Sequence, residues 1–246
     1  MRRYLDTTRT HTYSLLFALP LLVLYELGAM MMADGRGGGM RNGADVLLRT
    51  LLATGGVQGT LAFTAALAVG AAVIVALERR RKKVPLHGGY FVGMLAESTA
   101  YALVFGFVVA AATQLLLGGM VRFAADGGIT SMPLFDGIVL SLGAGIYEEL
   151  LFRVILTGGL FALLLAAGMK RRSAGVVAVV VSALVFSAFH YIGPYAYPLE
   201  LNSFTFRLLA GLAFSALYMT RGFGIAAWTH ALYDVFLVIA GVAMGR

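Results

Sequence analysis

Long apolar runs alternate with short polar and charged segments along almost the whole chain. The runs are about 18 residues or longer, the length that a helix needs to cross the hydrocarbon core of a bilayer. The weaker alternating pattern of an outer-membrane barrel is absent. We therefore expect an all-α protein, a polytopic transmembrane helical bundle, with seven spans at 13–32, 57–77, 91–117, 136–167, 174–190, 204–220 and 223–244.

Two segments leave the number of spans open. The piece 46–56, "VLLRTLLATGG", is too short to cross a membrane and carries Arg49. It suits an amphipathic helix in the interface or one half of a broken helix. The run 136–167 is longer than one upright span needs, so we expect it to tilt, to protrude or to break near Gly158 and Gly159. An eight-span arrangement therefore stays open.

The basic residues gather in the connections between the apolar runs. Such an excess of positive charge marks the cytoplasmic side of a membrane protein. The first run is too long for the core of a signal peptide, so we expect it to be retained as a span. A cytoplasmic N-terminus then puts four basic groups on the cytoplasmic side: Arg2 with Arg3 and Arg9, "ERRRKK" at 78–83, "KRR" at 170–172, and Arg221.

Composition narrows the class of protein further. Hydrophobic residues make up 60% of the chain and charged residues 13%, which is far from the usage of soluble domains. The net charge of +7 would suggest nucleic acid as the partner of a soluble protein. Here the cations follow membrane topology, so we expect a lipid bilayer and no nucleic acid. The absence of cysteine excludes disulfides and thiolate chemistry. With no repeat and no linker, residues 1–246 are expected to form a single integral membrane domain.

Ionisable side chains inside membrane spans are costly, which makes them candidates for function. Glu26 and Glu97 also suit buried hydrogen-bonding roles, and Arg207, near a span end, suits snorkelling toward the interface. A lone histidine such as His190 at a span end is often only an interfacial residue. The candidates are Glu26, Glu97, Glu148, Glu149, Arg153, His190, Arg207, His230 and Asp234.

Spacing separates these candidates. Glu149 and Arg153 are four positions apart on one helix, in the order that favours an ion pair. Glu148 lies about 100° around that helix and has Phe152, not a cation, four positions on. An unpaired carboxylate in a low-dielectric site is a candidate general base or acid. His230 and Asp234 also share a face, where the carboxylate would either orient the imidazole or join helices by a structural hydrogen bond.

Three motifs on three apolar helices carry a resemblance. They are Glu-Glu-x-x-x-Arg (148, 149, 153), Phe-x-x-x-His (186, 190) and His-x-x-x-Asp (230, 234). In this order they resemble the CAAX-protease and bacteriocin-processing family of intramembrane proteases, also called the CPBP or Abi family. The resemblance covers about residues 130–240, the expected catalytic core. It implies an intramembrane endopeptidase that hydrolyses a peptide bond of a membrane-associated protein or peptide by an activated water.

The resemblance also implies roles for single residues. Glu148 would be the general base, His190 would hold the water, and His230 with Asp234 would line the oxyanion side. The motif residues Glu149, Arg153 and Phe186 would support them. Eukaryotic members of the family have Asn where this chain has Asp234. An ionised Asp cannot donate a hydrogen bond, so His230 is the better oxyanion donor, and Asp234 either orients it or is protonated.

A metal-dependent mechanism stays open. The side chains of Glu148, His190, His230 and Asp234 would make a set of two histidines and two carboxylates suited to zinc. The zincin pattern His-Glu-x-x-His is absent, and we favour a glutamate-dependent mechanism without a cofactor. The predicted spans put His230 closer to the cytoplasmic end than Glu148 or His190, which requires tilted or broken helices.

Two other functions compete with proteolysis. A catalytically silent family member would act as a membrane interaction partner. A transporter could also use buried acid and histidine pairs, but the chain shows no inverted repeat. The compact length and "AAWTHALYD" look bacterial, so we expect the bacterial cytoplasmic membrane. Prenylated substrates are not expected there, which leaves signal peptides, bacteriocin leaders and membrane-anchored protein tails as candidates.

Overall fold

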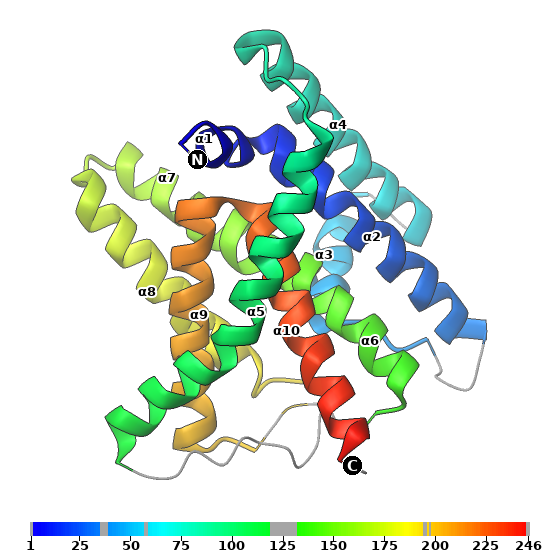
Figure 1. The fold of residues 1–246 in the computed structure, drawn as a ribbon, viewed down its shortest axis with the longest axis vertical. Helices are drawn as coiled ribbons and strands as arrows, with labels where there is room; N and C mark the ends of the chain where they lie inside the picture. The colour runs from blue at the N-terminus through cyan, green and yellow to red at the C-terminus, as the bar shows by residue number, and fades with distance from the viewer. Residues whose placement is uncertain are drawn as a thin grey trace.

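The computed structural model describes residues 2–34, 39–56, 59–118, 132–193, 196 and 198–244, and all regular structure in these residues is helical (Figure 1). The first residues of the predicted span 57–77 and of the predicted core 130–240 lie outside this described part. The helices are α1 Arg2–Thr8, α2 His11–Asp34, α3 Gly43–Thr54, α4 Thr60–Lys82, α5 Gly88–Leu117, α6 Leu134–Gly143, η2 Ala144–Glu148, η3 Leu150–Gly158, α7 Gly159–Ala166, α8 Arg171–Phe189, α9 Leu201–Arg221 and α10 Phe223–Ala243, of which η2 and η3 are π-helical.

Within the described residues, seven helical segments are long and apolar enough to cross a membrane. Each of them overlaps one of the seven predicted spans, so the all-α polytopic fold is confirmed. The seven segments are His11–Met32, Ala62–Lys82, Gly88–Leu117, Leu134–Ala166, Arg171–Phe189, Leu201–Arg221 and Phe223–Ala243.

The short segment around Arg49 forms a helix of its own, α3, with 12 residues. The side chain of Asn42 caps its first turn by accepting a hydrogen bond from the backbone N–H of Ala44 at 2.9 Å. One face of α3 is buried and packs against η2 and α4. At about 1.5 Å per residue, α3 is too short to be an eighth span.

The long fourth run stays helical throughout and crosses the molecule diagonally from α6 to α7 (Figure 1). The expected break at Gly158 and Gly159 does not occur. Both residues have helical backbone angles, with φ near −67° and −65°, because η3 passes directly into α7 there. The run is therefore one continuous helical segment with a change of helical register between α6 and α7.

Helix α10 runs through the middle of the bundle, where it contacts α2, α5, α6, η2 and α9 (Figure 1). Its small residues Ala226, Ala227 and Ala231 are fully buried. Small side chains allow helices in a membrane to approach closely. Gly222 alone connects α9 to α10, with a φ of +87° that favours glycine. This arrangement carries the third motif into the centre of the molecule.

Candidate active site

The two glutamates of the first motif lie where the long fourth helix is π-helical. Glu148 ends η2, and Glu149 separates η2 from η3. Such π-helical turns occur often at functional sites, because they shift the faces on which neighbouring side chains emerge. Glu149 is fully buried, whereas Glu148 keeps a small exposed fraction of 8%. The two carboxylates therefore have different surroundings and different partners.

Glu149 forms the ion pair that the sequence predicted. Its Oε2 lies 3.3 Å from Nε of Arg153, and both side chains are fully buried. The guanidinium of Arg153 also lies over the rings of Phe186, at 4.3 Å, and Phe214, at 5.3 Å. A buried cation gains from the negative face of an aromatic ring. This cluster joins the first motif to α8 and α9.

The second oxygen of Glu149 binds the histidine of the third motif. Oε1 of Glu149 lies 2.8 Å from Nδ1 of His230. On the other side of the ring, Nε2 of His230 lies 3.6 Å from Oδ2 of Asp234. The imidazole also stacks on Phe214, with ring centroids 4.5 Å apart. The expected contact of His230 with Asp234 is present, but Glu149 is the closer partner. The spacing of residues in the sequence did not predict the contact between His230 and Glu149.

Glu148 faces the histidine of the second motif. Its Oε2 lies 4.0 Å from Nε2 of His190, and this Oε2 is buried without a hydrogen-bond partner in the described part of the chain. Nδ1 of His190 lies 2.9 Å from the backbone oxygen of Phe186. A carbonyl oxygen only accepts, so Nδ1 must be the protonated nitrogen. In the neutral ring, Nε2 then offers a lone pair toward Glu148.

Asn42 is a site residue that the sequence analysis missed. Its side-chain amide donates a hydrogen bond of 2.9 Å to Oε1 of Glu148. The backbone N–H of Asn42 in turn donates to the hydroxyl of Tyr25 at 3.2 Å, and that hydroxyl donates to Asp45 at 2.8 Å. The only local signal was a capping residue just before a short helix, which does not point to chemistry.

A buried network of charged side chains is connected to Asn42 through Tyr25 and Asp45. Glu26 accepts hydrogen bonds from Arg49 and from the hydroxyl of Tyr147, both at 2.6 Å, and it pairs with Arg41 at 3.3 Å. Arg41 also pairs with Asp45 at 2.8 Å. The expectation of a buried hydrogen-bonding role for Glu26 is confirmed. Because Tyr147 directly precedes Glu148, this network fixes both the helix and the segment that carries Asn42.

The remaining candidates are Glu97 and Arg207. Glu97 is bound by Arg221, with Nε at 2.6 Å, and it accepts a hydrogen bond of 2.9 Å from Tyr4. Burial, together with the neighbouring carboxylate, raises the pKa of Tyr4 to about 12, so its hydroxyl remains a donor. This role of Glu97 is the buried hydrogen bonding that we expected. Arg207 donates a hydrogen bond of 3.2 Å to the hydroxyl of Tyr191.

All three motifs meet at one place. Phe186 lies between them, with its ring centroid 4.9 Å from that of His190 and 6.3 Å from that of His230. The predicted offset of His230 along the membrane normal therefore does not separate it from the first motif. The run from α6 to α7 packs against α10, and this packing brings the first and third motifs together.

The proposed metal ligands do not converge in this arrangement. Among the residues that the structure describes, no three His, Cys, Asp or Glu side chains are placed to hold one metal ion. Glu148 and His190 face each other as one pair, and His230 faces Asp234 on one side and Glu149, which is not in the set, on the other. A zinc ion bound by all four residues would require different side-chain rotamers.

Comparison with known proteins bears on the second half of the chain. Residues 130–236 match the family described as type II CAAX prenyl endopeptidase Rce1-like. No curated protein and no solved structure matches the chain. The matched residues contain all three motifs, from Glu148 to Asp234, so the expected resemblance is confirmed. Residues 130–236 of this chain are therefore similar to the Rce1-like family of type II CAAX prenyl endopeptidases.

Proposed function

We propose that this protein is an intramembrane endopeptidase that hydrolyses a peptide bond of a membrane-associated protein or peptide. The match of residues 130–236 to a CAAX-type protease family supports peptidase activity in general. The observation that carries the specific proposal is the 4.0 Å separation between Oε2 of Glu148 and Nε2 of His190. This separation is too long for a direct hydrogen bond and suits a single bridging water.

The two facing atoms would act on that water together. Ionised Oε2 of Glu148 and the Nε2 lone pair of His190 are both acceptors, so one water can donate a proton to each. Its oxygen then turns a lone pair toward a substrate carbonyl. Asn42 holds the other oxygen of Glu148 and so leaves Oε2 free for the water. Glu148 is the general base in this proposal, His190 orients the water, and Asn42 is a positioning residue.

The reaction balances with these groups alone. Glu148 takes a proton from the water as the water oxygen bonds to the carbonyl carbon, which creates a tetrahedral oxyanion. Nε2 of His230 is the candidate donor to this oxyanion, with the ring as an imidazolium. Nδ1–H donates to Glu149, so Nε2 carries a proton only in that form, and its distance of 3.6 Å to Asp234 exceeds a hydrogen bond. Collapse of the intermediate breaks the C–N bond, and the proton passes from Glu148 to the leaving amine.

The membrane setting follows from the fold. Seven apolar helices and the protease family support an integral membrane protein. We propose the bacterial cytoplasmic membrane, from the compact length, and a cytoplasmic N-terminus, from the basic segments given above. The contact of Asn42 with Glu148 supports one membrane domain, in which the segment before residue 130 completes the core at 130–240.

The test is hydrolysis in ¹⁸O-labelled water. The full chain and its Glu148→Gln variant are reconstituted into liposomes with membrane-anchored peptides, including a prenylated peptide and a signal peptide. Mass spectrometry of the products should show one ¹⁸O in each new carboxylate, and only with the unmodified chain. Equal cleavage by Glu148→Gln would contradict the proposal. Absence of any Glu148-dependent product from the host's own membranes would favour a catalytically silent interaction partner.

A further inference from the structure

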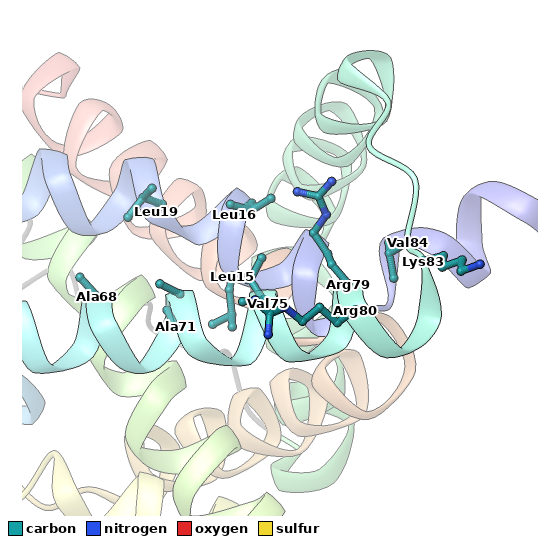
Figure 2. Close-up of a pocket in the computed structure, with 12 residues that line it drawn as sticks. Leu15, Leu16, Leu19, Ala68, Ala71, Val75, Arg79, Arg80, Lys83 and Val84 are labelled. Atoms are coloured by element: carbon teal, nitrogen blue, oxygen red, sulfur yellow. The ribbon is translucent and has the colours of Figure 1, made fainter.

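A groove runs between α2 and α4, and none of the residues that line it belongs to the three motifs. Its cavity volume is about 680 Å³. Figure 2 shows leucines of α2 along one wall, small residues of α4 along the other, and basic residues at the C-terminal end of α4. The lining residues are Leu15, Leu16, Leu19, Ala68, Ala71, Ala72, Val75, Ala76, Arg79, Arg80, Lys83 and Val84.

The basic end of the groove carries unbalanced positive charge. Arg79, Arg80 and Lys83 are exposed, and no carboxylate in the described part of the chain forms an ion pair with them. The neighbouring Glu78 is already engaged, since it accepts hydrogen bonds from the backbone N–H of Thr12 at 2.7 Å and from Lys82 at 3.0 Å. An anionic group would therefore meet three cations and no competing acid there.

The depth of the groove matches one leaflet of a bilayer. Arg80 lies twelve positions after Ala68, which is about 18 Å along a helix. Half of the hydrocarbon core is about 15 Å. Only 11% of the most apolar window of α4 is buried within the molecule, the smallest share of the seven candidate spans. Much of the surface of α4 is therefore free to contact another molecule.

We propose that this groove binds one anionic phospholipid. The headgroup phosphate lies at Arg79, Arg80 and Lys83, and an acyl chain fills the recess left by the alanines of α4. Basic pockets between membrane helices suit acidic headgroups. An extended peptide fits less well, because its backbone N–H and C=O groups would meet an apolar wall without hydrogen-bond partners. This proposal is independent of the protease function, since the groove contains no motif residue.

The experiment is native mass spectrometry of the full chain, released from bilayers that contain equal amounts of phosphatidylglycerol and phosphatidylcholine. The unmodified chain should retain one phosphatidylglycerol in preference to phosphatidylcholine. Arg80→Gln should reduce this retention about fivefold, the effect of one cation near an acidic lipid. Arg81→Gln is the matched control, because Arg81 is adjacent and exposed but does not line the groove. It should have little effect.

A second pair of variants tests the apolar recess. Ala72→Phe should displace the acyl chain and lower retention, whereas Val73→Phe, at an exposed position outside the groove, should not. Equal retention of both lipids, equal losses with Arg80→Gln and Arg81→Gln, or no effect of Ala72→Phe would each overturn the proposal. Loss of the bound lipid on addition of inorganic phosphate alone would also overturn the proposal. A dimer without bound lipid that Ala72→Phe dissociates would do the same, because a second copy of the chain would then fill the groove.

Discussion

The side-chain amide of Asn42 donates a hydrogen bond of 2.9 Å to Glu148, across 106 positions of the chain. This bond occupies Oε1 of the carboxylate and leaves Oε2 facing His190 at 4.0 Å. The group that orients the proposed base thus comes from the segment before α3, outside the residues that match the protease family. The proposed site is built by both halves of the chain.

Asn42→Ser separates this positioning role from helix capping. Serine keeps a side-chain oxygen that can cap α3, but it loses the amide that reaches Glu148. We expect kcat to fall about tenfold or more, because a hydrogen bond to a charged group is lost, while KM and the melting temperature change little. Steady-state kinetics and thermal unfolding in detergent measure these effects. Unchanged kcat in a variant of normal stability would remove Asn42 from the mechanism.

The two adjacent glutamates should differ in their effect on stability. Glu149→Gln leaves the fully buried Arg153 without its ion-pair partner, a change that costs about 3–5 kcal/mol. Glu148→Gln leaves no buried cation unpaired, since the facing His190, at 4.0 Å, is neutral in this account. We expect a large loss of melting temperature with Glu149→Gln and a small one with Glu148→Gln. Equal melting temperatures would show that the Glu149 pair does not stabilise the fold.

Substitutions of His230 and of Asp234 should lower the catalytic rate by different amounts. Removing one oxyanion donor costs about 10²–10³ in kcat, and we expect this loss with His230→Ala. Asp234→Asn should retain activity within about tenfold, because Asp234 lies too far from His230 for a hydrogen bond and Asn can donate. Values of kcat/KM for both variants, measured on one substrate, show which substitution lowers activity more. The reverse order of losses would assign the oxyanion to Asp234.

Metal content gives a further prediction. In the described residues no three of the proposed ligands converge on one point, so we expect no shared zinc site among them. Elemental analysis of active protein should give well below one zinc per chain, and a chelator should leave cleavage intact. About one zinc per chain, lost in both Glu148→Gln and His230→Ala, would make this a metalloprotease.

The fold was largely predictable because a bilayer restricts what a chain can do. Each backbone polar group must find its partner within its own helix, so apolar runs of the right length become spans. The ion pair between Glu149 and Arg153 was predictable for a similar reason, since four positions along a helix fix a common face. Both inferences depend only on neighbours in the sequence.

The contacts that were missed are all long-range. Asn42 reaches Glu148 across the bundle, and Glu149 reaches His230 across 81 positions. No periodicity encodes which side chains meet when α3, η2 and α10 pack together. The π-helical register of η2 and η3 was also hidden, because it arises from packing and not from the propensity of the residues between Ala144 and Gly158.

The most direct test of the central claim is single-turnover cleavage by the unmodified chain and by Glu148→Gln in identical liposomes. If Glu148 is the general base, the variant should lose about 10²–10⁴ in rate while its melting temperature stays close to that of the unmodified chain. A normally folded Glu148→Gln protein that cleaves at the unmodified rate would contradict the account.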